Sequence, residues 1–155
     1  MFLLIKFIIG VLLILAIAGV ARTWQEEHRA NQKLFSTGTV PAPLPDGFYT
    51  GTVPGHTFSW LGKKFNAADA VGINVFTDGE GQAERYPFKT SSAKGIRDRN
   101  LEVLAIDYDT SGNPFWLRPI LDEIVQVAPN QYLGKLHIRL IPGYPVTVGY
   151  FELKK

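Results

Sequence analysis

An apolar run at the N-terminus constrains this chain more than any other feature. Lys6 is the single charged residue between Met1 and Ala21, and residues 7–21 contain nothing more polar than glycine. A helix of this length, rising about 1.5 Å per residue, covers the hydrocarbon core of a bilayer, which is about 30 Å thick. We therefore expect residues 1–21 to form a transmembrane anchor or a signal peptide.

The same run fits two interpretations. As a cleaved signal peptide it would have Lys6 near its positive end and small-residue cleavage patterns at residues 16–18 or 19–21. The uncleaved anchor fits better, because the run from Phe7 reaches the upper limit of a signal-peptide core and further apolar residues precede Lys6. We therefore predict a single-pass membrane protein.

Opposing signals bear on which side of the membrane the rest of the chain lies. Arg22, Arg29 and Lys33 come after the apolar run, and a count of Lys and Arg alone would place the C-terminal domain in the cytoplasm. A very short head before an N-terminal apolar segment is instead typical of a signal anchor that exports the domain behind it. We predict that the domain is extracytoplasmic.

Composition limits the partners of the remaining chain. The sequence has 155 residues, and about 115 remain after the anchor and its flank, which is the size of one domain with one core. Residues 36–155 carry twelve Lys or Arg and twelve Asp or Glu, so this domain lacks the positive surface that nucleic acid binding needs. Because the chain has no cysteine, disulfides, thiolate metal sites and cysteine acylation are excluded.

The segment after the apolar run is predicted to connect anchor and domain. Residues 22–35 are mostly polar and favour a helix, so we expect the anchor helix to continue into water, with Trp24 at the membrane interface. Three alternating prolines in residues 40–45 favour an extended, semi-rigid spacer. The predicted organisation is an anchor over 1–21, a helix and linker over 22–45, and a β domain over 46–155.

Short β-prone segments separated by turns occupy the chain from residue 46 onward. They are rich in β-branched and aromatic residues and are bounded by Gly, Pro, Asn and Asp. The segments are residues 48–53, 72–76, 83–90, 101–108, 124–127, 132–141 and 146–153. This spacing predicts an all-β fold, a small antiparallel lipocalin-like barrel of about seven or eight strands, with a sandwich as the alternative. Short helical pieces are expected at residues 67–71 and after Asn113.

Alternation in residues 132–140 separates the two faces of one predicted strand. Tyr132 and alternate apolar residues lie on one face, and Lys135, His137 and Arg139 lie on the other. We expect the first face to be core and the second to be wet. A neutral imidazole is able to ligate haem iron or another metal, so haem bound through His137 is one interpretation, beside an ordinary surface histidine.

One motif carries a resemblance to a known family. Residues 51–65 read GTVPGHTFSWLGKKF, in which Pro-Gly-His precedes Trp-x-Gly-Lys-x-Phe. This stretch resembles a family of uncharacterised bacterial proteins with a GxWxxxG-type opening and a Trp-x-Gly-Lys-x-Phe element. Residues 108–109, 120–123 and 132–134 are similar to that family's later elements. The resemblance covers most of the β domain.

The resemblance implies a small lipocalin-like or nitrobindin-like β-barrel, and the family supplies no established activity. The chain departs from the pattern at residues 49–51, where the tryptophan and one glycine of the full opening are missing. No ligand site is therefore carried over from that opening. From the residues themselves, Trp60 and Phe65 suggest an aromatic plug for one end of the barrel, with Lys63 and Lys64 on the solvent side.

Catalytic and metal-binding motifs are missing from the sequence. It has no GxSxG nucleophile elbow, no phosphate-binding GxxxxGK[ST] and no dinucleotide-binding GxGxxG. His28, His56 and His137 lie too far apart for a local metal site. Asp107 and Asp109 would share a face at a strand end, where carboxylates can hold a hard cation, but the residues after them also spell an ordinary polar turn. The sequence therefore predicts no metal centre and favours a non-enzymatic role.

These observations predict a membrane-anchored barrel that binds a small hydrophobic or amphipathic ligand, such as a lipid, because barrels of about eight strands can hold one such molecule. The candidate ligand contacts are His56, Trp60, Tyr108, Arg118, Tyr132, His137 and Arg139. One alternative is an enzyme acting on a lipidic substrate inside the barrel, with His56, Asp107 or Asp109, and Arg139 as acid–base and anchoring groups. The other is a structural subunit of a membrane complex, with a solid barrel core.

Overall fold

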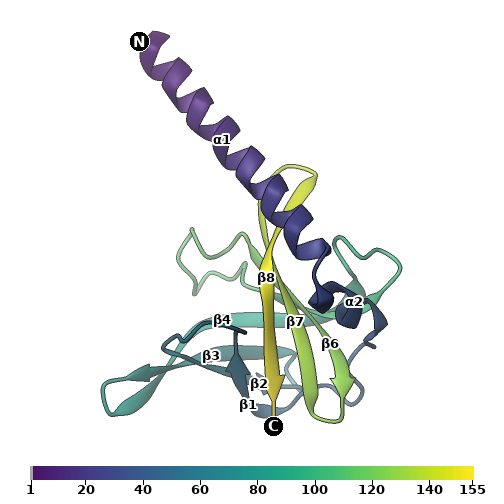
Figure 1. The fold of residues 1–155 in the computed structure, drawn as a ribbon. Helices are drawn as coiled ribbons and strands as arrows, with labels where there is room; N and C mark the ends of the chain where they lie inside the picture. The colour runs from purple at the N-terminus through teal and green to yellow at the C-terminus, as the bar shows by residue number, and fades with distance from the viewer. Residues whose placement is uncertain (1) are drawn as a thin grey trace.

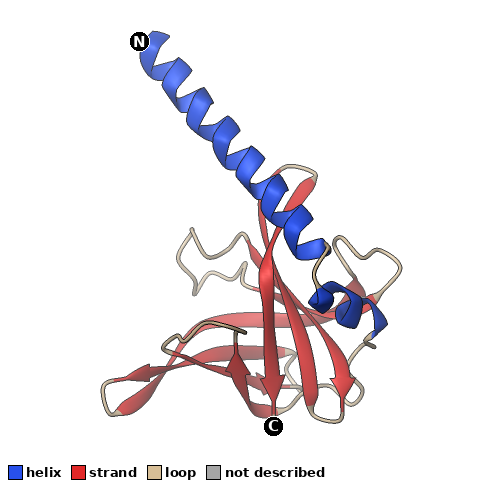
Figure 2. Ribbon diagram, viewed as in Figure 1, coloured by secondary structure: helices blue, strands red, loops and turns tan. Residues whose placement is uncertain are grey.

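The computed structural model describes residues 2–155 and shows a closed antiparallel β-barrel that carries two N-terminal helices. The helices are α1 (Phe2–Glu27) and α2 (Ala30–Thr37), and the strands are β1 (Gly47–Thr52), β2 (Trp60–Asn66), β3 (Val71–Asp78), β4 (Gly81–Lys94), β5 (Glu102–Asp107), β6 (Ile120–Ala128), β7 (Gln131–Ile141) and β8 (Tyr144–Lys154). Each strand pairs with the next, and β8 closes the barrel on β1. The prediction of an all-β antiparallel barrel behind an apolar helix is confirmed (Figures 1 and 2).

Two local expectations differ from the structure. Residues 60–66, which were not among the predicted β-prone segments, form strand β2, so the barrel has eight strands. Residues 67–70 form a turn and not a helix. Asn66 Oδ1 accepts the Asp69 N–H at 3.1 Å, as a helix cap would, but Ala70 has a φ of +53° and the chain enters β3 at once. The stretch after Asn113 also forms turns before Pro119 leads into β6.

Helix α1 lies against the start of β8 and extends away from the barrel (Figure 1). A Cβ added to Gly19 would lie 3.0 Å from the Val146 side chain. The Thr23 hydroxyl accepts the Thr147 N–H at 3.0 Å. By length and composition, Leu3–Glu27 is apolar enough to cross a membrane.

The polar flank of α1 packs on the barrel, so the expectation that it runs into water is wrong. Thr23, Glu26 and Phe35 are buried. Backbone hydrogen bonds join Thr39 to Gln126 on β6, at 3.1 and 2.7 Å. The proline stretch after Thr39 therefore runs along the barrel and does not hold it away from the helices.

An apolar patch on the outer surface of the barrel explains this packing. Side chains on the outer faces of the strands would be exposed without α2, and they bury Phe35 completely. The patch consists of Val103, Val125, Leu133 and Tyr150, with Leu101 at its edge. Burial of apolar area therefore holds the juxtamembrane segment on the barrel.

Aromatic rings fill the end of the barrel at which the C-terminus lies. Tyr49, Phe65, Phe88 and Tyr132 pack with ring centroids 5.3 to 5.8 Å apart. Such tilted and edge-on contacts are favourable for aromatic side chains. We call this the packed end, and the opposite end, which carries the β1–β2, β5–β6 and β7–β8 connections, the open end.

A β-bulge between Trp60 and Gly62 sets the side-chain directions in β2. The bulge adds one residue to β2 opposite β3. In a regular strand Trp60 and Lys63 would point to opposite faces, but the added residue turns both into the barrel. Lys63 is consequently only 2% exposed, so the expectation that it faces solvent is wrong, whereas Lys64 is exposed as expected.

Candidate functional site

A cavity of about 260 Å³ lies inside the barrel toward its open end. Its wall is mostly apolar and aromatic, with a few polar side chains. The lining residues are Val53, Trp60, Lys63, Asn74, Phe76, Tyr86, Tyr108, Trp116, Leu117, Ile120, Asp122, Leu136 and Phe151. Because Trp116 is 55% exposed, the cavity reaches the molecular surface at the β5–β6 connection.

Four of these residues, Lys63, Asn74, Tyr108 and Asp122, form what we call the polar cluster. Lys63 Nζ donates to Asp122 Oδ2 at 2.9 Å, to Asn74 Oδ1 at 3.0 Å and to the Tyr108 hydroxyl. These acceptors match the N–H donors of an ammonium group. The Trp60 indole N–H also donates to Asn74 Oδ1, at 3.1 Å. The cluster is thus a hydrogen-bonded ion pair inside an apolar barrel.

Aromatic rings surround the Lys63 ammonium. Ring centroids at 5.1 to 5.5 Å from Nζ belong to Trp60, Phe88, Tyr108 and Phe151. Ring faces attract a cation electrostatically, which offsets part of the lost hydration. The ion pair with Asp122 offsets more of it, so the charge of Lys63 is held by its neighbours and not by water.

Burial changes the proton affinities in the polar cluster. Removal from water lowers the pKa of the Lys63 amine, and the negative charge of Asp122 opposes that shift. Burial also raises the pKa of the Tyr108 hydroxyl well above its usual value, and the charge of Asp122 adds to this effect. Tyr108 therefore stays protonated and is within donating distance of Asp122 Oδ2, at 3.2 Å.

A second bulge shapes the edge of the cavity at β4. Tyr86 is unpaired in the β3–β4 register and has a φ of +62°, which is unusual for a residue other than glycine. Its carbonyl accepts the Asn74 side-chain N–H at 3.1 Å. Its ring packs edge-on against Phe76 and Trp116, with centroids 5.6 and 6.0 Å away. The strained backbone thus directs an aromatic ring to the cavity wall.

The seven candidate contacts from the sequence divide between the inside and the outside of the barrel. Trp60 and Tyr108 line the cavity. Tyr132 lies inside the barrel but among the rings of the packed end. His56 is exposed in the β1–β2 connection, where its ring stacks on Phe58 with centroids 5.7 Å apart.

Arg118 and Arg139 hold the β5–β6 connection from outside. Arg139 pairs with both Asp107 oxygens at 2.6 and 3.1 Å and donates to the Arg118 carbonyl at 3.2 Å. Arg118 Nε donates to the Asn113 carbonyl at 3.1 Å. Burial raises the pKa of Asp107, but the hydrogen bonds from Arg139 and the Asp109 N–H outweigh it, so the pKa lies below its usual value. Asp107 and Asp109 therefore serve a turn.

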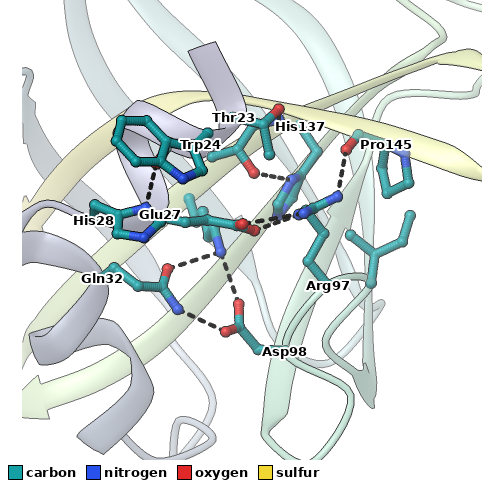
Figure 3. Close-up of polar contacts among 12 residues, drawn as sticks. Thr23, Trp24, Glu27, His28, Gln32, Arg97, Asp98, His137 and Pro145 are labelled. Atoms are coloured by element: carbon teal, nitrogen blue, oxygen red, sulfur yellow. Dashed lines mark hydrogen bonds and ion pairs between the residues drawn. The ribbon is translucent and has the colours of Figure 1, made fainter. Parts of the chain in front are cut away.

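His137 lies on the outer face of β7, and this face is buried, not wet as predicted. His137 and Lys135 are both 0% exposed. The His137 ring nitrogens lie 3.2 Å from Glu123 Oε2 and 3.2 Å from Thr147 Oγ1. Thr147 in turn contacts Thr23 of α1, so His137 lies under the helix (Figure 3). A haem iron would have to displace one of these two contacts.

Buried polar contacts also attach α2 to the barrel. Lys135 Nζ donates to Gln32 Oε1 and to Asp98 Oδ2, both at 2.8 Å. Gln32 Nε2 donates to the other Asp98 oxygen at 2.7 Å. Figure 3 shows Gln32 facing Asp98 beside the ion pair of Arg97 with Glu27. These outer residues join the helices to the barrel.

We expect Lys135→Met to lower the free energy of unfolding by about 2 kcal/mol or more, because Asp98 loses its cation in a partly buried site. Chemical denaturation of the purified protein measures this change. Limited trypsin digestion should also cut faster at Arg29 and Lys33 as α2 loosens. The control is Lys94→Met, which removes an exposed ion pair with Glu102 and should change stability by less than about 1 kcal/mol. Equal effects of the two variants would contradict the buried attachment.

Buried tyrosines predict a loss of stability in alkali. Burial raises the pKa values of Tyr108, Tyr132 and Tyr150 above the ordinary value of 10.0. The folded protein therefore keeps protons that the unfolded chain releases, so stability is retained below about pH 10 and falls as the pH rises further. Tyrosinate absorbance of the folded protein should show these three groups titrating later than free tyrosine, together with unfolding. Ionisation of all six tyrosines near pH 10 without unfolding would refute this.

Sequence reasoning missed Lys63, Asn74 and Asp122 as residues of one site. A signal for Asp122 was present, because the period of two in a strand places it on the same face as Ile124, which is fully buried. The inward direction of Lys63 depends on the bulge, for which Gly62 inside the β-prone segment was the available signal. Within residues 2–155, no group of three or more His, Cys, Asp or Glu side chains could hold a metal ion.

Comparison with known proteins gives a likeness in fold. No protein-family model matches the chain, and no curated protein matches it either. A solved structure, a protein from Thermomonospora curvata, superposes with a TM-score of 0.59 at 18% sequence identity, covering 80% of this chain and 84% of that one. At this identity the likeness establishes the barrel fold and nothing about a ligand or a reaction.

Proposed function

We propose that this protein is a membrane-anchored β-barrel that binds a small apolar or amphipathic ligand in its cavity. The observation that carries the proposal is an apolar cavity of about 260 Å³ with the polar cluster at its inner end. Small-molecule sites commonly combine an apolar wall with a few polar groups that orient the ligand. Aromatic and aliphatic side chains fill the rest of the barrel interior, so the cavity is a localised site.

We infer that the ligand enters from the membrane. The β7–β8 hairpin lies beside α1, and the connections of the open end project on the side toward which α1 extends (Figure 1). Large apolar side chains are exposed there, with Phe115 at 83%, Trp116 at 55% and Leu140 at 70%. Aromatic side chains of this kind favour the interface between lipid and water. A bilayer around α1 would therefore lie close to the mouth of the cavity.

The size of the cavity restricts the ligand. Its volume lies just below the range of about 300–1,000 Å³ that is typical of small-molecule sites. It suits a small molecule, or the head of a longer amphiphile whose tail stays in lipid. His56, Asp107, Asp109 and Arg139, the groups expected to serve an enzyme, do not line it, so the geometry favours binding over catalysis.

We further propose that the barrel faces the extracytoplasmic side, as the short head before the apolar run suggests. Alkaline phosphatase folds into its active form only outside the cytoplasm, so a fusion of this enzyme after Lys155 should show phosphatase activity in cells. Fluorescence of a C-terminal green fluorescent protein in place of phosphatase activity would place the barrel in the cytoplasm.

Native mass spectrometry of the protein after mild detergent extraction tests the binding proposal. We expect a bound small molecule on the wild-type protein and none on Leu136→Trp. Leu136 lines the cavity and pairs with Asp122 across β6 and β7, so a tryptophan ring at this position would fill the cavity. Leu34→Trp is the control, since Leu34 is exposed on α2. A folded wild-type protein that carries no small molecule and takes up none from added lipid extract would contradict the proposal.

A further inference from the structure

The two oxygens of the Asp122 carboxylate have unequal environments. Oδ2 accepts hydrogen bonds from Lys63 Nζ at 2.9 Å and from the Tyr108 hydroxyl at 3.2 Å. Oδ1 is buried and has no hydrogen-bond partner among the described residues. The Asp122 side chain is 3% exposed and lines the cavity. A buried carboxylate oxygen without a donor is costly, so a donor that reaches Oδ1 from the cavity would stabilise the site.

The polar cluster cannot supply that donor itself. Lys63 directs its donors to Asp122 Oδ2, Asn74 and Tyr108. The Asn74 amide donates to the Tyr86 carbonyl at 3.1 Å and to the Tyr108 hydroxyl at 3.0 Å. Their donors are thus engaged, and the indole N–H of Trp60 is bound to Asn74.

We infer that the cavity binds a neutral ligand whose hydroxyl group donates a hydrogen bond to Asp122 Oδ1. This inference rests on the proposed function and names the class of ligand, an alcohol or phenol with an apolar body. The wall around the carboxylate is apolar and aromatic, which suits the body of such a molecule.

Charge argues against another class of amphipathic ligand, the fatty acids. Among the described residues that line the cavity, Lys63 is the only cation, and it is already paired with Asp122. The lining residues therefore carry no net charge to attract an anion. A ligand carboxylate at the same place would meet the Asp122 oxygen and be repelled. A hydroxyl group offers the missing donor without adding a charge.

Matched probes test the inference on the full chain in detergent, by isothermal titration calorimetry against protein-free micelles. The probes are 2-naphthol, 2-methoxynaphthalene, which lacks the donor, and 2-naphthoate, which is an anion. We expect 2-naphthol to bind about tenfold or more tightly than its methyl ether, as for a hydrogen bond to a charged acceptor. We expect 2-naphthoate to bind most weakly.

Variants assign the preference to the carboxylate. Asp122→Asn should reduce the ratio of the affinities for 2-naphthol and its methyl ether. Glu123→Gln should leave this ratio unchanged, because Glu123 is an equally buried carboxylate but lies on the outer face. If Asp122→Asn fails to fold, the probe series on the wild-type protein still decides.

The outcomes separate the two proposals. Equal affinities for 2-naphthol and its ether, or tightest binding of 2-naphthoate, would overturn the inference and leave ligand binding intact. If the folded protein binds none of the three probes, the inference fails; the proposed function fails with it if the protein also takes up no small molecule from added lipid extract.

Discussion

Asp122→Ala is expected to lower the free energy of unfolding by about 3–5 kcal/mol, because it leaves the Lys63 ammonium buried without its counter-ion. Water stabilises the Lys63 charge little, since the residue is only 2% exposed and its ammonium group is surrounded by aromatic rings. Its remaining acceptors, Asn74 and Tyr108, are neutral and cannot balance the charge. Chemical denaturation followed by circular dichroism measures the change.

The control for this prediction removes both charges together. Lys63→Met combined with Asp122→Leu fills the same space with apolar atoms and should recover most of the lost stability, because no buried charge is left unpaired. If Asp122→Ala alone changes stability by less than about 1 kcal/mol, Lys63 is not held as a buried ammonium. The polar cluster would then be a weak basis for ligand recognition.

The second large effect is expected at the bulge in β2. Gly62→Ala should destabilise the barrel by about 3 kcal/mol or more, because two separate costs add. Gly62 has a φ of +144°, where a side chain strains the backbone. An added Cβ would also run into the carbonyl of Tyr49 on β1 and lie 2.8 Å from the Gly51 nitrogen. Backbone atoms in a paired strand cannot move aside without breaking the β1–β2 pairing.

Gly143→Ala separates these two costs. Gly143 also has a positive φ, +73°, but an added Cβ would meet nothing within 4 Å. This variant should therefore show the backbone strain alone, about 1–2 kcal/mol. Thermal and chemical denaturation of both variants give the comparison. Equal losses would mean that β1 and β2 pack less closely at Gly62 than the short Cβ distances imply.

Loss of the bulge should also remove the cavity. Without the added residue in β2, Trp60 and Lys63 cannot both face inward. Any Gly62→Ala protein that folds should bind 2-naphthol no better than Leu136→Trp does. The bulge thus explains the Trp-x-Gly-Lys-x-Phe element in this chain, since the glycine of the element allows its tryptophan and lysine to point to the same face of β2.

Local patterns in the sequence determined the large features of this protein. The apolar run predicted the long helix that begins at Phe2, because its composition is uniform over many turns. Short β-prone segments between turn residues predicted the barrel, since alternation and turn chemistry act over a few residues. Two cavity residues, Trp60 and Tyr108, were also found in this way.

The tertiary structure alone decided which buried groups meet. The pairs Lys63 with Asp122 and Lys135 with Asp98 join residues far apart in the chain. The first pair meets inside the closed barrel, and the second meets where the β4–β5 connection packs on its outer face. A single bulged residue reversed the face of Lys63. Gly62 within the strand is compatible with a bulge, but only the pairing of β2 with β3 shows that one residue is added there. The sequence of the outer face of β7 predicts a polar, solvated surface, yet the two helices bury Lys135 and His137 on it. A period of two separates the faces of a strand, but only the packing of other elements decides which faces meet water.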